Sequence, residues 1–257
     1  MSEIIFEHPD YLIVNKPAGL LTHKDLQNKE TKTLADFLLE KYPEIKGVGE
    51  TLKINFLRHK TNENLNENKE NNFIEIYKPG IVHRLDKDTS GVMIVARNQK
   101  SYIYFKSLFK NRKIEKTYHA FVYENIKEDE FNINEPIGRN KINFKQRQAG
   151  KNARGKMREA ETYFRILKRS PSKKYTLLEA KPKTGRTHQI RAHLKFIYKP
   201  IVSDEIYAQD RKNDLGFKRL ALHSYKISFI SPENVKMEFK APYPPDFKVA
   251  KEKLLLL

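Results

Sequence analysis

The amino-acid sequence predicts an α+β fold built from several short strands and a few amphipathic helices. Three patterns carry this prediction. Residues 92–96 form a continuous apolar run of strand length, residues 116–123 alternate as a strand should, and residues 99–110 repeat their apolar side chains at helical spacing. The 257 residues, of which 39% are hydrophobic, suffice for a sizeable core. We therefore expect a single domain over residues 1–257.

The N-terminal part of the chain predicts two strands followed by a helix. Residues 4–6 and 11–14 are short apolar runs, separated by a turn that contains a Pro. Residues 33–40 repeat apolar side chains at helical spacing. Thr33 and Asp36 stand three apart at the start of this helix, which is the spacing of a capping box.

The rest of the chain predicts a polar insertion and a longer series of elements. Residues 55–72 are polar and nearly low in complexity, which indicates a flexible surface insertion and not a domain boundary. Asn98 is placed to cap the helix at residues 99–110. The later expected elements are strands at residues 116–123, 161–167, 175–180, 220–225 and 235–240, a helix at residues 188–196, and a short helix from residue 247.

The chain carries a large excess of positive charge. Lys and Arg total 50 against 32 Asp and Glu, which gives a formal net charge of +18. Such an excess points to a polyanionic partner, most simply nucleic acid. The charge is also clustered, since residues 139–174 hold 13 basic residues and only two acids, Glu159 and Glu161. A general bias of the composition toward Lys does not explain this clustering.

The sequence argues against disulfides, metal ligation and a membrane segment. It contains no Cys, which excludes thiolate ligands. His188 and His193 are five residues apart, whereas helical zinc sites place two His four apart, so we expect no metal. No apolar run approaches the roughly 18 residues that a membrane helix needs, and the N-terminus has no leader pattern. A soluble cytoplasmic protein is the expectation.

A polar loop directly before the apolar run is the strongest candidate for a functional site. Its sequence, HRLDKDTSG at residues 83–91, holds the carboxylates of Asp86 and Asp88. A rigid strand can aim such a loop into a cleft, which makes Asp86 the candidate catalytic centre. Alternatively, both acids belong to a turn that Gly91 closes, and their side chains bond their own backbone. The kinase catalytic loop is not matched, because an extra residue intervenes and no glycine-rich phosphate loop precedes it.

Two further loops carry basic residues that could face an anion. The segment NKPAG at residues 15–19 holds Lys16 on a turn shaped by one Pro and one Gly, although an ordinary turn explains these residues equally well. Arg186 directly precedes the helix expected at residues 188–196. Free N–H groups and the helix dipole favour an anion at that position.

Three separated motifs occur in a fixed order along the chain. They are YLIVNKPAG at residues 11–19, HRLDKDTSG at residues 83–91 and KTGRTHQIRAH at residues 183–193. Together they resemble the RluA branch of the RNA pseudouridine synthases, and residues 116–120 and 222–223 resemble weaker motifs of the group. The resemblance covers nearly the whole chain, and its central nine residues are specific.

The resemblance implies a pseudouridine synthase fold, in which helices flank a long mixed, largely antiparallel sheet with a central basic cleft. The implied reaction is isomerisation of a flipped uridine to pseudouridine in structured RNA, with no cofactor and no metal. Within this branch we expect large-subunit ribosomal RNA as the substrate, with transfer RNA as the alternative. We expect the protein to be a monomer.

The resemblance also implies roles for particular residues. Asp86 is the catalytic carboxylate, Tyr118 stacks on the target base, and Arg186 pairs with the carboxylate. A nearby guanidinium favours the charged form of a carboxylate in a closed pocket. The expected substrate-binding residues are Arg84, Lys16, Asn15 and Arg191.

The chain departs from the family pattern in two ways. No small RNA-binding domain of the S4 type precedes the catalytic motifs, although many relatives carry one, so the basic surface would have to grip the RNA. Ser203 and Asp204 stand where relatives usually have Gly and Asp.

Two rival functions are open from the sequence. A non-catalytic RNA-binding or RNA-chaperone protein on the same fold would not depend on Asp86. An enzyme that cleaves N-glycosidic bonds outright would normally need a second acid as proton donor, for which Asp88 is the obvious nearby candidate.

Overall fold

The computed structural model describes residues 2–24, 31–55, 73–143, 146–151, 153–209 and 211–257. The insertion predicted at residues 55–72 lies outside the described residues except at its first position, so it stays a prediction. None of the helices in the described ranges combines the length and hydropathy that crossing a membrane requires.

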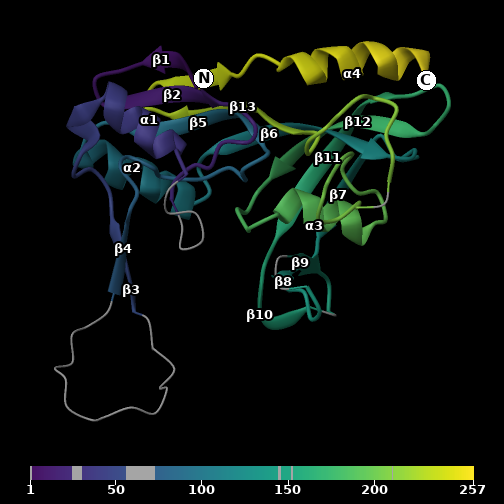
Figure 1. Ribbon diagram of the computed structural model, residues 1–257, viewed down its shortest axis with the longest axis horizontal. Helices are drawn as coiled ribbons and strands as arrows, with labels where there is room; N and C mark the ends of the chain where they lie inside the picture. The colour runs from purple at the N-terminus through teal and green to yellow at the C-terminus, as the bar shows by residue number, and fades with distance from the viewer. Residues whose placement is uncertain (1, 25–30, 56–72, 144–145, 152, 210) are drawn as a thin grey trace, which may run out of the picture.

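A nine-stranded sheet runs through both halves of the molecule (Figure 1). Its strands lie in the order β1 (Glu3–Glu7), β2 (Tyr11–Lys16), β5 (Ser90–Ala96), β13 (Leu222–Ile230), β6 (Glu115–Tyr123), β12 (Tyr175–Pro182), β11 (Glu161–Arg169) and β7 (Glu130–Asn134), and β14 (Lys236–Lys240) pairs with β13. These pairings are antiparallel except that of β5 with β13, which is parallel. The structure thus confirms the predicted long, mixed and largely antiparallel sheet.

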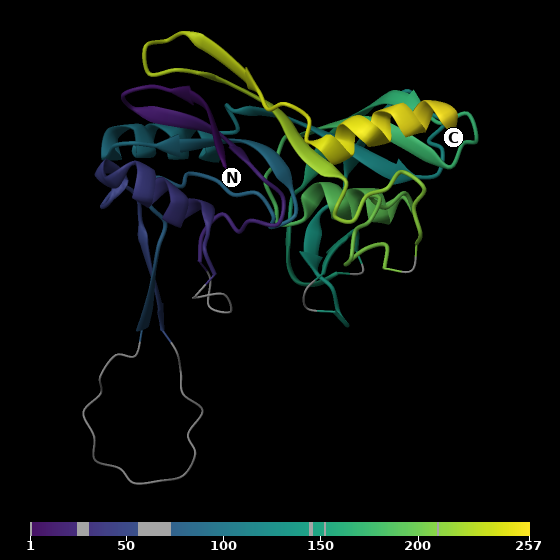
Figure 2. The same cartoon turned by 45° about the horizontal axis from the view of Figure 1, so that its top comes forward.

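Two smaller sheets extend from this body. One is a hairpin of β3 (Thr51–Asn55) and β4 (Phe73–Tyr77). The other has the order β10-β8-β9 and is formed by β8 (Ile137–Arg139), β9 (Arg147–Ala149) and β10 (Arg154–Arg158). Figure 1 and Figure 2 show that both project to the same side of the large sheet. Five basic residues of the predicted basic segment lie on the second of these sheets: Arg139, Arg147, Arg154, Lys156 and Arg158.

The described residues form four α-helices, each where the sequence predicts one. They are α1 (Leu34–Lys41), α2 (Gln99–Lys110), α3 (Gln189–Phe196) and α4 (Pro245–Leu256), and a 3₁₀ helix at Pro43–Ile45 follows α1. The predicted capping box is present, because the Thr33 hydroxyl accepts from the Asp36 N–H at 3.3 Å and the Asp36 carboxylate accepts from the Thr33 N–H at 3.0 Å. Asn98 caps α2 as predicted, accepting from the Ser101 N–H at 2.9 Å.

The core of the N-terminal half lies on both faces of β2 and β5. Successive side chains of a strand point to opposite faces, and here each face is covered by a different helix. Leu12 belongs to a cluster with Leu38 of α1, whereas Ile13 belongs to a cluster with Phe105 of α2. Every residue of β5 is buried for the same reason, which explains the continuous apolar run in the sequence.

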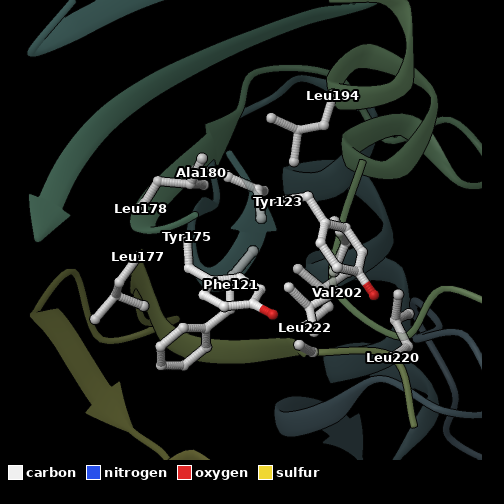
Figure 3. Close-up of a cluster of buried hydrophobic side chains, with 14 of the residues drawn as sticks. Phe121, Tyr123, Tyr175, Leu177, Leu178, Ala180, Leu194, Val202, Leu220 and Leu222 are labelled. Carbon is white, nitrogen blue, oxygen red and sulfur yellow. The ribbon is translucent and has the colours of Figure 1, made fainter. Parts of the chain in front are cut away.

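The core of the other half lies between β6, β12, α3 and α4. Figure 3 shows part of this cluster, in which Phe121 and Leu178 come from the sheet and Leu194 from α3. The ring of Phe247 in α4 lies 5.4 Å from that of Phe121, measured between centroids. The two halves thus have separate cores, and they are joined through the strands at the middle of the sheet.

Gly91 allows these two halves to approach closely. It lies where β5 pairs with β13, opposite Ser224. Its φ is +118°, and a Cβ atom at this position would lie 2.1 Å from the carbonyl oxygen of Ser224. The last residue of the HRLDKDTSG motif is therefore a Gly because two strands meet there, and not only because it closes a turn.

We expect Gly91→Ala to lower the free energy of unfolding by about 4 kcal/mol or more, because the methyl group has no room and the backbone is strained. Gly155→Ala is the matched control. Gly155 has φ +76° but no atom within 4 Å of its Cβ position, so backbone strain alone should cost about 1–2 kcal/mol. Urea unfolding measures the free energy of unfolding of both variants. An equal decrease in the two would contradict the argument that the methyl group at residue 91 has no room.

Candidate active site

A cavity of about 560 Å³ lies beside the junction of the two halves. Its walls come from the loop before β5, the C-terminal end of α2, β6, and the loop that leads from β12 into α3. The predicted site residues that line it are Arg84, Asp86, Tyr118, Arg186 and Arg191. Elements far apart in the sequence therefore meet in one place, and two of the three family motifs contribute to it.

The Asp86 carboxylate is held by side chains of α3 and its N-cap, and not by its own backbone. Its Oδ2 accepts a hydrogen bond from Nη1 of Arg191 at 3.0 Å and lies 3.8 Å from Nε2 of His188. Its Oδ1 forms no hydrogen bond with a residue that the structure describes, and the side chain is 25% exposed. The loop does contain a turn, since the Asp86 carbonyl accepts from the Thr89 N–H at 3.1 Å. The turn hypothesis therefore holds for the backbone but not for the carboxylate.

Arg191 is itself fixed by a second carboxylate. Its Nε and Nη2 each donate to Asp204 at 2.8 Å, and its guanidinium lies 5.2 Å from the ring centre of Tyr207. Asp204 is buried and also accepts from the backbone N–H groups of Ile206 and Tyr207. Burial opposes the charge of Arg191, but hydrogen bonds to Asp204 and the charges of Asp204 and Asp86 raise its pKa overall. The guanidinium thus uses Nε and Nη2 for Asp204 and keeps its third nitrogen, Nη1, for Asp86.

The prediction that Arg186 pairs with Asp86 is wrong. Nε of Arg186 donates instead to the carbonyl oxygen of Glu159 at 2.9 Å. The loop before α3 is closed by the buried amide of Gln189, which accepts from the Arg186 N–H at 3.0 Å. Arg186 lies in this loop, whereas Arg191 lies in the first turn of α3 and reaches the carboxylate. Arg186 still lines the cavity, as does the neighbouring Lys183.

Tyr118 lies on β6 and lines the cavity between the cores of the two halves. Burial raises the pKa of its hydroxyl to about 12, so the side chain is neutral at pH 7. Lys116, two residues earlier on the same face of β6, also lines the cavity, and burial lowers its pKa to about 8. The sequence motif at residues 116–120 thus places an aromatic ring and an ammonium group side by side.

Lys16 is buried, and its predicted role in substrate binding is wrong. Nζ donates to the carbonyl oxygens of Pro17, Leu20 and Lys87 at 2.8, 2.7 and 2.9 Å. Burial lowers the pKa of Lys16 to about 7. The bond to Lys87 ties the N-terminal loop to the loop of Asp86, so Lys16 supports the site without touching the cavity.

We expect Lys16→Met to lower the free energy of unfolding by about 3 kcal/mol, because three carbonyl oxygens lose their donor. Lys100→Met, on the exposed face of α2, is the control and should change it by less than about 0.5 kcal/mol. Urea unfolding compares the two variants. A Lys16→Met protein as stable as Lys100→Met would show that the three hydrogen bonds contribute nothing.

The other predicted substrate-binding residues differ in position. Arg84 is exposed, lines the cavity and has no ion-pair or hydrogen-bond partner in the described part of the chain. Asn15 does not line the cavity, and its Nδ2 lies 3.4 Å from a carboxylate oxygen of Glu3 on the neighbouring strand. The substrate-binding role of Asn15 therefore stays a prediction that the cavity does not support, and that of Arg84 stays a prediction for an exposed residue of the cavity wall.

Positive charge surrounds a single carboxylate in this cavity. Among the described residues that line it, Asp86 is the only acid. The basic residues that line it are Arg84, Lys110, Arg112, Lys116, Lys183, Arg186 and Arg191. The structure thus has the predicted basic cleft, whose charge would attract phosphate groups.

His188 and Ser203 adopt left-handed backbone conformations. His188 caps α3 with φ +56°, and its Nδ1 lies 3.3 Å from the Tyr207 hydroxyl. Ser203, where the family resemblance predicts Gly, has φ +54°. Its hydroxyl donates to the Phe217 carbonyl at 3.0 Å, which helps to hold a conformation that Gly would adopt more easily. The turn still places Asp204 against Arg191, so the departure from the family pattern does not alter the site.

His193 lies in the core and not at the cavity. Its ring nitrogens lie 2.9 Å from the Thr162 hydroxyl and 3.0 Å from the Glu135 carbonyl oxygen. Over the ranges that the structure describes, the only group able to bring three metal-ligand atoms together is His8, Asp10 and Glu233, and none of these lines the cavity.

Comparison with known proteins agrees with this geometry. A family model described as RNA pseudouridylate synthase matches residues 10–196. The chain belongs to this family. Ribosomal large subunit pseudouridine synthase D of Borreliella burgdorferi is 37% identical over 248 residues, which are 96% of this chain and 66% of that protein. An uncharacterised RNA pseudouridine synthase of Mycoplasma genitalium is 32% identical over 260 residues, which are 99% of this chain and 70% of that protein.

The chain thus spans about two thirds of the length of these two relatives. Among solved structures, human RNA pseudouridylate synthase domain containing 4 matches with a TM-score of 0.69 at 22% identity, over 98% of this chain and 92% of that one. Human RNA pseudouridylate synthase domain containing 1 has the same TM-score and identity, over 95% of this chain and 84% of that one. These likenesses confirm the predicted pseudouridine synthase fold.

Proposed function

We propose that the protein isomerises uridine to pseudouridine in RNA and that Asp86 is the catalytic carboxylate. The observation that carries the proposal is a single carboxylate in a cavity lined by basic residues, with Oδ2 held by Arg191 and Oδ1 free of described partners. Tyr118 lines the same cavity. Membership of the pseudouridylate synthase family supports the type of reaction.

In this proposal, the bond between N1 of the uracil and C1′ of the sugar breaks, and the uracil turns. Its C5 then bonds to C1′, C5 loses its proton, and N1 gains one. Arg191 holds one carboxylate oxygen of Asp86 and leaves the other free to react. That oxygen can add to the base, add to the sugar, or remove a proton from the sugar. All three routes need an oxygen without competing hydrogen bonds, which is what Oδ1 provides.

Tyr118 would serve as a platform for the flipped base. A detached uracil needs a flat surface that holds it by stacking while it turns, and a neutral aromatic ring provides one. Taking a base out of its stack costs a few kcal/mol, and phosphate contacts can offset this cost. The cations of the cavity could make such contacts, as could the exposed Arg154, Lys156 and Arg158 of edge strand β10.

Large-subunit ribosomal RNA is the substrate that we propose. The name of the relative from Borreliella burgdorferi gives the ribosomal large subunit for that protein, and transfer RNA is the alternative here. We further propose that residues 1–257 form one catalytic domain that acts as a monomer in the cytoplasm, where ribosomes are found.

The test is to incubate the protein with total RNA from a strain that lacks its gene, and to separate the nucleosides after digestion. We expect pseudouridine and no free uracil. Free uracil without pseudouridine would indicate an N-glycosidic hydrolase, although Asp88, the second acid such an enzyme would need, does not line this cavity. Bound RNA without either product would indicate a non-catalytic RNA-binding protein.

A further inference from the structure

A second cavity, of about 250 Å³, also borders Asp86. It shares four of its wall residues with the first cavity: Arg84, Asp86, His188 and Arg191. Tyr118 lines only the first cavity. A group bound in the second cavity would therefore lie next to a uridine that occupies the space between Asp86 and Tyr118.

Besides Arg84, which both cavities share, four charged side chains at the second cavity are unpaired. Asp88 and Glu205 supply two carboxylates, and Lys87 and Lys218 supply two ammonium groups. None of them forms an ion pair or a side-chain hydrogen bond with any residue in the described ranges. Arg219 in the same wall is different, because a carboxylate of α4 accepts two hydrogen bonds from it. The four unpaired groups are available to a ligand.

Three apolar side chains also line the second cavity, among mostly polar and charged ones. Leu21 and Leu220 are buried in its wall, and Ile206 is partly buried there. A wall with both apolar and hydrogen-bonding side chains suits a nucleobase, whose faces are apolar and whose edge forms hydrogen bonds. A free phosphate fits less well, because it would meet the carboxylates of Asp88 and Glu205 as well as the two ammonium groups.

We propose that the second cavity binds the nucleotide next to the target uridine, and that Glu205 and Asp88 select a base with an exocyclic amino group. This inference rests on the proposed function. Adenine, cytosine and guanine each carry an amino group that can donate to a carboxylate. Uracil has no amino group; its one ring donor on this edge, N3–H, lies between two carbonyl oxygens that a carboxylate repels. Lys87 and Lys218 bind the phosphates on either side of the selected base.

The test compares substrates that differ only beside the target. The modified uridine is first mapped in total RNA from a strain that lacks the gene. Synthetic RNAs of that site then carry each of the four bases at the 5′ or the 3′ neighbour, with compensating changes that preserve base pairing. Single-turnover rates of pseudouridine formation are measured for the wild type, Glu205→Gln and Glu252→Gln. Both Glu side chains are exposed, and Glu252, on α4, lines neither cavity.

For the wild type, uridine at one of the two neighbours should react about fivefold or more slowly than the other three bases. Glu205→Gln should reduce this difference to less than about twofold, since an amide also offers a donor to a carbonyl oxygen. Glu252→Gln should keep the wild-type difference. A wild type that tolerates every base at both neighbours would overturn the inference, as would a Glu205→Gln variant with unchanged discrimination. Failure of the wild type to form pseudouridine would contradict the proposed function instead, so the two failures are distinguishable.

Discussion

Asp86→Asn is expected to slow pseudouridine formation by about 10³-fold or more, while RNA affinity changes by less than about threefold. The amide keeps the size of the carboxylate and can still accept from Arg191, but it can neither attack as an anion nor take a proton. Affinity should be retained because it comes from the cations of the cavity and of β10. Single-turnover rates and filter binding at one fixed salt concentration measure the two quantities.

Asp129→Asn is the matched control for this variant. Asp129 has a side chain that is 85% exposed, lines neither cavity and undergoes the same change of charge. The Asp129→Asn variant should form pseudouridine at the wild-type rate. Turnover of Asp86→Asn within about tenfold of the wild type would contradict the catalytic assignment. A parallel loss of rate and affinity would show that Asp86 binds RNA instead.

Arg191→Lys should lower kcat by about tenfold or more, whereas Arg186→Lys should leave kcat within about threefold of the wild type. A single ammonium group cannot replace a fork that contacts Asp204 through two nitrogens and Asp86 through the third. The only side-chain hydrogen bond of Arg186 to the described residues goes to a backbone carbonyl, so its conservative variant should mainly change KM. Steady-state kinetics on one defined RNA separates kcat from KM.

Both variants keep their positive charge, so a difference between them reports the geometry of the donors. Urea unfolding establishes first that each variant is folded, because Arg191 is buried and its replacement could lower stability. If Arg186→Lys lost kcat and Arg191→Lys did not, the carboxylate would pair with Arg186 during the reaction, as the family motif predicted.

The four helices of the described residues and all strands of the large sheet except β7 follow from patterns that act over a few residues, whereas the strands of the two smaller sheets were not predicted. The capping box of Thr33 and Asp36 and the cap formed by Asn98 need hydrogen bonds between residues three apart, so the local sequence determines them. The order of the strands is different. β13 lies between β5 and β6 although it is far from both in the sequence. Local patterns do not specify that pairing, and only the family resemblance indicated the architecture of the sheet.

The same limit explains which site residues could be predicted. Asp86 and Tyr118 lie in motifs that resemble the family, and the structure brings both to one cavity. The partner of Asp86 depends on how the loop before α3 folds, and the local sequence does not distinguish Arg191 from Arg186, the two Arg of the motif. Asp204 had no local signal, because its role depends on contact with Arg191 across a turn.

Lys16 shows how burial can reverse a prediction. A basic residue on a loop with a Pro and a Gly could face a phosphate, and no local pattern shows whether its ammonium group reaches solvent. One of its three acceptors is the carbonyl of Lys87, 71 residues later in the chain. Only the folded chain brings that carbonyl within reach of Lys16. The side chain that was predicted to contact RNA therefore stabilises the loop of Asp86 instead.

The most direct test of the central claim is tritium release from RNA labelled at C5 of uridine and prepared from a strain that lacks the gene. Joining C5 to the sugar expels the hydrogen at that position, so release reports isomerisation itself. We predict that the wild type releases tritium in proportion to the pseudouridine formed and that Asp86→Asn releases none. A folded wild type that binds this RNA without releasing tritium would contradict the claim that the protein is an isomerase.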